Sequence, residues 1–167
     1  MRRSHSNEEE EFIHFRSCIE RLNSARNILL LIQEHNDHPL VGPAFQFALI
    51  EYCKPYLNSY GINVDSKGKP KTIKLDGSLV PKQYEELHCR IIAARNTINA
   101  HDDLTVKEPQ LHVVPLEKER FVGILQNNIS GTESFTNIAD IISMIEMTLT
   151  AMYLEEARLE KLLPESE

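Results

Sequence analysis

The feature that most constrains the fold is an amphipathic pattern near the start of the chain. Over about residues 7–36, apolar side chains recur at steps of three and four, which is the spacing of one face of an α-helix. They are Phe12, Phe15, Ile19, Leu22, Ala25, Leu29 and Ile32. Asn7 is the expected N-cap, and the acidic residues 8–11 suit the positive end of the helix dipole and are expected in solvent. The pattern predicts one long helix.

Three more segments predict helices by the same periodicity. The second is expected over about residues 40–59, where Pro55 should kink the final turn because it lacks a backbone donor. The third begins near residues 78–82 and ends around 99–103. The last covers about residues 134–163. No internal repeat interrupts this layout.

The segments outside these helices are expected to form loops and short strands. Residues 60–80 carry glycines and four lysines and are expected to form a long basic loop. Residues 104–131 are expected to form an insertion of two short edge strands, and residues 1–7 a flexible tail. We therefore expect an all-α fold in a single domain over 1–167: an up-and-down bundle of four long helices, with a small β-hairpin-like insertion between helices three and four.

Composition excludes several classes of protein. With 41% hydrophobic residues the chain can form a core, so full disorder is excluded. The longest apolar run, residues 28–32, is far shorter than the ~20 residues of a membrane span. The first residues lack the apolar core of a signal peptide, so we expect a cytoplasmic protein without membrane contact. Cys18, Cys53 and Cys89 are far apart and are expected to be reduced core thiols.

Charge is distributed unevenly along the chain. The formal net charge is −7, of which the segment 133–167, with eight acids and two bases, contributes −6. The remainder is therefore nearly neutral, and it contains a group of lysines at positions 67, 69, 71 and 74. Lys67, Lys69, Lys71 and Lys74 are either a solubilising loop or an arm that contacts RNA phosphates. The charge pattern neither requires nor excludes RNA as a partner.

The most specific local feature is the string from Arg95 to Asp103, which reads RNTINAHDD. An Arg followed by a polar residue, with a His four to six residues later, resembles the active-site motif of the HEPN family (higher eukaryotes and prokaryotes nucleotide-binding domains). The extended form RNxxxAHxD matches at Arg95, Asn96, Ala100, His101 and Asp103. Two weaker similarities are His88, seven residues before the Arg, and the segment Tyr52-x-x-Pro55-Tyr56.

The resemblance implies a metal-independent ribonuclease in which Arg95, Asn96 and His101 are catalytic and His88, Asp102 and Asp103 support them. His exchanges protons near neutral pH, and a guanidinium stabilises charge on a phosphate. On a straight helix, His101 would lie about 120° around and ~9 Å along from Arg95. The two converge only if the helix bends or ends there, or if a second chain contributes. The resemblance therefore implies a homodimer through the motif-bearing helix, without cofactors, in a toxin–antitoxin or phage-defence setting.

Other interpretations remain open at this level. Arg95 could pair with Asp102 or Asp103 and close the helix, which suits a non-catalytic HEPN-like module that binds a nucleotide, an antitoxin or another protein. A di-iron bundle would use two Glu-x-x-His pairs and two further carboxylates, as ferritin-like sites do. The candidates are Glu11, His14, Glu51, Glu85, His88 and Glu146. In a chain this rich in Glu, two such pairs are unremarkable, so a structural or metal-binding helical protein is the weakest of the three interpretations.

Overall fold

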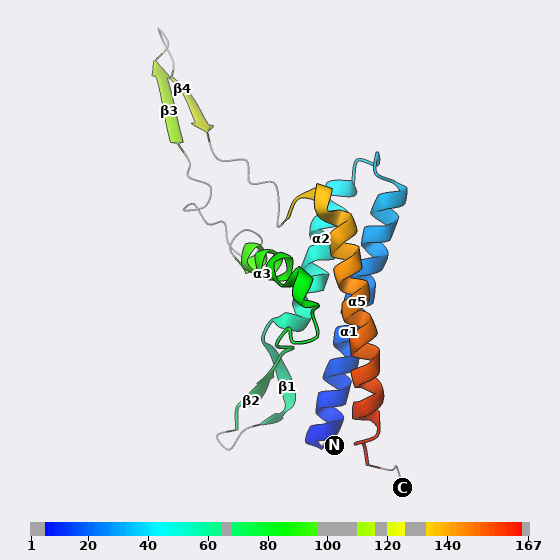
Figure 1. The fold of residues 1–167 in the computed structure, drawn as a ribbon. Helices are drawn as coiled ribbons and strands as arrows, with labels where there is room; N and C mark the ends of the chain where they lie inside the picture. The colour runs from blue at the N-terminus through cyan, green and yellow to red at the C-terminus, as the bar shows by residue number, and fades with distance from the viewer. Residues whose placement is uncertain (1–5, 65–67, 97–109, 116–119, 126–132, 165–167) are drawn as a thin grey trace.

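A computed structural model describes residues 6–64, 68–96, 110–115, 120–125 and 133–164. Four α-helices and two antiparallel hairpins are present among these residues (Figure 1). The helices are α1 (Asn7–Glu34), α2 (Val41–Cys53), α3 (Glu85–Ala94) and α5 (Ile138–Glu160). The strands are β1 (Ser59–Val64), β2 (Pro70–Ile73), β3 (Gln110–Pro115) and β4 (Arg120–Leu125).

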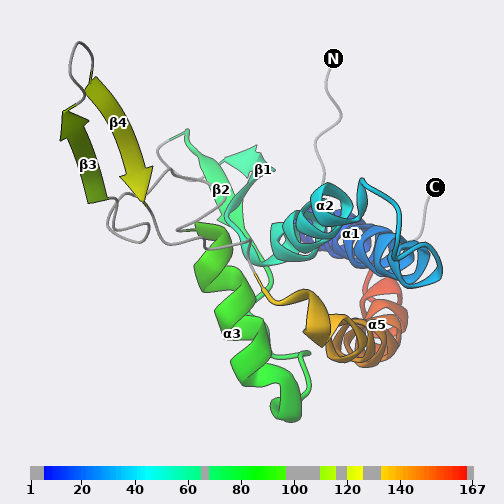
Figure 2. The same cartoon turned by 90° about the horizontal axis from the view of Figure 1, so that it is seen from above.

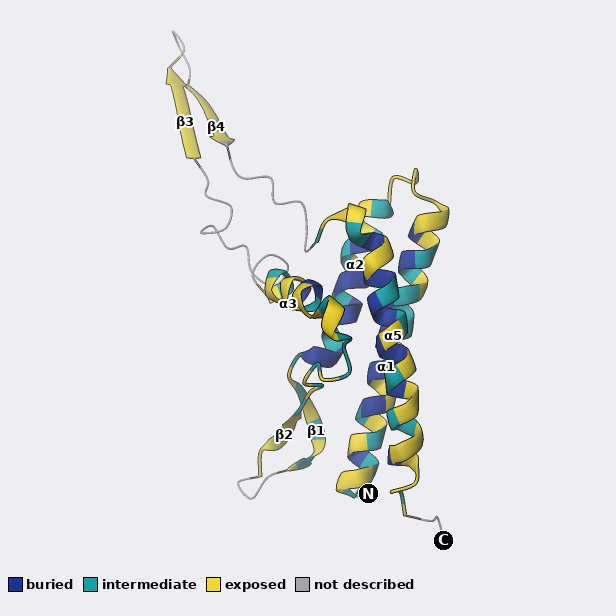
Figure 3. Ribbon diagram, viewed as in Figure 1, coloured by how far each residue is buried: buried dark blue, intermediate teal, exposed yellow. Residues whose placement is uncertain are grey.

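The core lies between α1, α2 and α5, which form one group of packed helices (Figure 2). The long helices α1 and α5 run antiparallel, and α2 covers α1 from the other side. The predicted apolar face of the first helix is confirmed, because all of its members but Phe12 are buried. In α5, Ile141 and Ile145 are fully buried and belong to the same core cluster as this stripe. Figure 3 shows the buried residues concentrated where the three helices meet.

The first turn of α1 differs in detail from the prediction. The N-cap is Ser6 rather than Asn7: the Ser6 hydroxyl accepts from the Glu9 backbone N–H at 3.1 Å, and the Glu9 carboxylate accepts from the Ser6 N–H at 2.7 Å. This reciprocal pair is a capping box. Within the acidic run, Glu10 is buried, with 6% exposure, instead of lying in solvent.

The prediction of a long basic loop over residues 60–80 was wrong. Strands β1 and β2 pair there as an antiparallel hairpin, with Ser59 opposite Ile73. The hairpin is held against α1 because the Glu10 carboxylate accepts from two successive backbone N–H groups of β1, those of Ile62 and Asn63. Charge and glycine content suggested a loop, whereas the deciding contact comes from a residue fifty positions away in the sequence.

The predicted bundle of four long helices was also wrong. Only α1 and α5 are long; α2 has 13 residues and gives way at Lys54–Tyr56 to a 3₁₀ turn at Pro55, where the sequence predicted a kink. The third helix is shorter still, since α3 has 10 residues and begins at Glu85 after a 3₁₀ turn. It lies outside the group formed by α1, α2 and α5 (Figure 2). The described fold is largely α, with two small β-hairpins.

The strands of the insertion are present as predicted, whereas the cysteines follow the prediction only in part. The two strands predicted within the insertion are present, because β3 and β4 pair in a continuous antiparallel register from Gln110–Leu125 to Pro115–Arg120. The cysteines are free, and Cys18 and Cys53 are buried as expected. Cys89, however, is exposed on α3, because only the side of α3 that carries Leu87 and Ile91 faces the core.

Candidate functional site

The first half of the motif lies at the C-terminal end of α3. The regular helix ends at Ala94, and Arg95 and Asn96 follow in a π-helical turn. Such turns widen the backbone and are frequent at functional sites. The Arg95 side chain is half-buried, and its Nη1 donates to the Asn96 Oδ1 at 3.2 Å.

The guanidinium of Arg95 lies close to the end of α2. Burial raises the pKa of the Cys53 thiol to about 12, and the positive charge of Arg95 opposes that rise. Among the described residues, no carboxylate forms an ion pair with Arg95. The other predicted members of the site, His101, Asp102 and Asp103, lie outside the described residues.

His88 is the centre of an aromatic cluster beneath the motif. Its Nδ1 is hydrogen-bonded to the Tyr52 hydroxyl at 2.7 Å, and its ring packs edge-on against Tyr56 at 4.5 Å between centroids. Burial lowers the pKa of His88, which favours the neutral ring. Burial also raises the pKa of both tyrosines, so both hydroxyls stay protonated. The structure thus brings together the two weaker similarities of the sequence, one on α3 and one at the end of α2.

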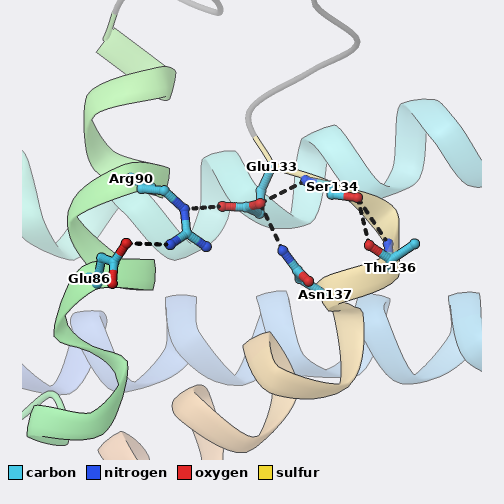
Figure 4. A network of polar contacts seen from close by, with 6 residues as sticks. All are labelled: Glu86, Arg90, Glu133, Ser134, Thr136 and Asn137. Carbon is cyan, nitrogen blue, oxygen red and sulfur yellow. Dashed lines mark hydrogen bonds and ion pairs between the residues drawn. The ribbon is translucent and has the colours of Figure 1, made fainter.

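A second cluster joins the opposite side of α3 to the start of α5 (Figure 4). The Arg90 guanidinium forms an ion pair with Glu86 of the same helix at 3.4 Å. It forms a second ion pair, at 3.2 Å, with Glu133, which precedes α5. Glu133 in turn accepts from the Ser134 backbone N–H and the Asn137 side chain. Burial alone would raise the pKa of Glu133, but these hydrogen bonds and Arg90 lower it. This network is not predicted from the sequence, because Arg90 and Glu133 are far apart in the chain. Together the two clusters fix α3, and so Arg95, relative to α2 and α5.

The described lysines of the predicted RNA-binding arm lie on and after the β1–β2 hairpin. Lys71 donates to the side chain of Asn7 at 3.2 Å, which ties β2 to the start of α1. Lys74 lines a cavity of about 290 Å³ between the segment 74–79, α1 and α5. Glu11, Asp76 and Glu155 line the same cavity, so carboxylates outnumber the lysine there. Lys69 is exposed, and Lys67 lies outside the described residues.

The six residues of the di-iron alternative are all described, and they do not gather. Glu51 is paired with Arg21 and Lys54, whereas Glu146 is paired with Arg26. Within the described part of the chain, no group of three His, Cys, Asp or Glu side chains is placed to hold a metal ion. A search of the same residues finds no helix with the length and apolar content to cross a membrane.

Comparisons with protein-family models, with curated proteins and with solved structures give no match. The HEPN resemblance therefore depends on the motif and on the cluster beneath it.

Proposed function

We propose that this protein is a metal-independent endoribonuclease of the HEPN type, with Arg95 and His101 as its catalytic pair. The observation that supports the proposal is the position of Arg95: it follows the last residue of α3, is half-buried, and has no ion-pair partner among the described residues. The planar guanidinium of an arginine can bind two oxygens of a phosphate at once. Asn96, bonded to Arg95, holds the side chain in place.

The reaction follows from the chemistry of these groups. His101 accepts the proton of a ribose 2′-hydroxyl, whose oxygen attacks the adjacent phosphorus atom. The bond to the 5′-oxygen of the next nucleotide breaks, and that oxygen takes the proton from His101 as it leaves. Arg95 stabilises the negative charge that develops on the phosphate oxygens. The products are a 2′,3′-cyclic phosphate and a free 5′-hydroxyl. His88 acts as a positioning residue, because its contacts with Tyr52 and Tyr56 fix the helix that carries Arg95.

We further propose that the active protein is a cytoplasmic homodimer in which the ends of two α3 helices face each other. Each α3 is joined to its own α2 and α5 by the two side-chain clusters, so it can present Arg95 as a rigid unit. RNA is the substrate, with Lys69 among the candidate contacts, and an antitoxin is the expected protein partner.

The test is cleavage of end-labelled RNA by purified protein in EDTA. Wild-type protein should produce fragments with 2′,3′-cyclic phosphate ends, and chelation should leave the rate unchanged. His101→Ala should lower the rate ~10²–10⁴-fold, as is typical for loss of a general acid–base group. Arg95→Lys should also lose cleavage activity, because lysine lacks the planar guanidinium that binds two phosphate oxygens.

The matched control is His35→Ala, an exposed histidine at the end of α1, which should cleave at the wild-type rate. All variants should keep the wild-type circular dichroism spectrum. Full activity in His101→Ala would refute the nuclease. If pure dimeric wild-type protein binds RNA or a nucleotide but cuts none of a varied set of RNAs, the non-catalytic binding module replaces it.

A further inference from the structure

A polar cavity of about 300 Å³ lies where α1 meets the 3₁₀ turn after α2 and the start of β1. Its lining residues come from positions 14–21 and 54–59, and none belongs to the Arg95 motif. Among the described residues, no Asp or Glu lines the cavity, although the chain has 25 acids and a net charge of −7. The polar residues that line it are His14, Ser17, Arg21, Lys54, Asn58 and Ser59. Such a lining favours an anion.

A buried carboxylate holds the two cations of this cavity in place. One oxygen of Glu51 accepts from the Arg21 Nη1 at 3.0 Å, and its other oxygen accepts from the Lys54 Nζ. Two positive charges and one negative charge leave this group with a net charge of +1, and both cations remain accessible to solvent. Glu10, one turn before His14, is bound to the backbone of β1 and does not line the cavity. An anion therefore meets positive charges that are already positioned, which reduces the entropy lost on binding.

The cavity has more hydrogen-bond donors than the protein uses. A guanidinium has five N–H donors and an ammonium has three, and the described hydrogen bonds to Glu51 use one of each. The side chains of Ser17, Asn58 and Ser59 form no hydrogen bond within the described part of the chain. These hydroxyl and amide donors lie beside the two cations in the lining of one cavity. The arrangement suits an anion with several acceptor oxygens.

We propose that this cavity binds a phosphate monoester, the group at the end of a phosphorylated molecule. Such a group carries close to two negative charges at neutral pH and has three oxygens that accept strong hydrogen bonds. The guanidinium of Arg21 can bind two of these oxygens, and Lys54 can bind the third. A phosphodiester inside a nucleic-acid strand has one charge and two free oxygens, so it would leave more of the donors unused. The proposal does not depend on ribonuclease activity.

The first test is calorimetric titration of the full chain with phenyl phosphate in a phosphate-free buffer. Phenyl phosphate is a small monoester whose ring can lie against Pro55 and Leu57 in the same cavity. Saturable binding is expected. Phenyl sulfate has the same shape and one charge fewer, so it should bind at least about tenfold more weakly. Absence of phenyl phosphate binding, or equal binding of the two compounds, would overturn the proposal.

The Ser17→Asp variant locates the binding, because it places a carboxylate at an exposed position of α1 that lines the cavity. It should weaken phenyl phosphate binding at least about tenfold, since the new carboxylate repels the ligand and can pair with Arg21 four residues later. The matched control is Asn27→Asp, which adds the same charge at an exposed position of α1 outside the cavity and should bind like the wild type. Both variants should keep the wild-type circular dichroism spectrum. Equal effects of the two would contradict the proposal, because binding would then depend on net charge alone.

Competition identifies the molecule that carries the phosphate. A short 2′-O-methyl RNA is suitable, because it lacks the 2′-hydroxyl and so stays intact even if the protein is a ribonuclease. Displacement of phenyl phosphate by the 5′-phosphorylated strand alone would support the site and assign the monoester to an RNA end. Displacement by neither strand, with phenyl phosphate still bound, would support it with a small phosphate ester as ligand. Equal displacement by the 5′-phosphorylated and 5′-hydroxyl strands would refute it, because phosphodiesters would then be the ligand.

Discussion

At the scale of single residues, Glu10 decides how the β1–β2 hairpin is attached. Its carboxylate is buried and accepts backbone N–H groups of β1, at 2.8 Å in the case of Asn63. The Glu10 carboxylate lies so close to the β1 backbone that the residue before Ile62 has no room for a side chain. A Cβ on Gly61 would lie 2.6 Å from the Glu10 Oε1. Gly61 is therefore needed because a side chain would not fit there. Its φ is not positive, so the backbone conformation itself does not require glycine.

We expect Gly61→Ala to destabilise the fold by about 1–3 kcal/mol, because the added methyl displaces a buried carboxylate from its hydrogen bonds. Gly42 in α2 is the control, since a Cβ there meets nothing within 4 Å. Gly42→Ala should stabilise the protein by up to about 1 kcal/mol, as alanine does in helices. Urea unfolding of both variants measures the difference, and a similar loss in the two would contradict the role of Gly61.

At the scale of elements, α1 organises the molecule, because α2, α5 and β1 all contact it. Its apolar stripe packs against α2 on one side and α5 on the other. Polar pairs at the edges of these contacts join the same helices: Arg21 binds the buried Glu51 of α2, and Arg16 binds Glu156 of α5. The stripe provides the stability, whereas pairs with exposed partners contribute little.

Substitutions of two leucines on α1 separate the effect of the buried stripe on stability from that of the exposed surface. Leu29 is fully buried and Leu31 is 57% exposed. We expect Leu29→Ala to cost about 2–5 kcal/mol, because it leaves a cavity between α1 and its neighbours. Leu31→Ala should change the free energy of unfolding by no more than about 0.5 kcal/mol. Denaturant melts of the two proteins compare the values directly; equal losses would mean that α1 is not packed as described.

At the scale of the whole molecule, the histidines and carboxylates with shifted pKa values share one direction: each pKa is lowered. Burial lowers the pKa of His14 and His88 below 6.5. Burial alone would raise the pKa of Glu51, but Lys54 and Arg21 lower it below 4.5. In each case the unfolded chain binds the proton more tightly than the folded chain does. The described part of the protein is therefore built to lose stability in acid.

The sign of this effect gives two pH windows. The stability linked to His14 and His88 is fully present above about pH 6.5 and is lost as the pH falls through 6.5 toward their folded pKa values. The contribution of Glu51 is lost below about pH 4.5. Calorimetric melts from about pH 8 to 3 should show the first step and the onset of the second. His88→Gln should reduce the first step, whereas the exposed His35→Gln should not; a melting temperature that is flat between pH 8 and 5 would contradict this linkage.

The sequence by itself determined the two long helices, α1 and α5, the break at Pro55 and the two strands of the insertion. The helices and strands follow from local periodicity, and the break follows from a proline, which lacks a backbone N–H donor. None of these features depends on contacts between residues far apart in the sequence. The motif at Arg95 was likewise visible as a string of residue types at fixed spacing. Only the tertiary structure decided where Glu10 lies, that residues 59–64 and 70–73 pair as a hairpin, and that α3 lies outside the packed group. These features depend on contacts between residues far apart in the sequence, such as Glu10 with Asn63, Tyr52 with His88 and Arg90 with Glu133, which local patterns do not encode.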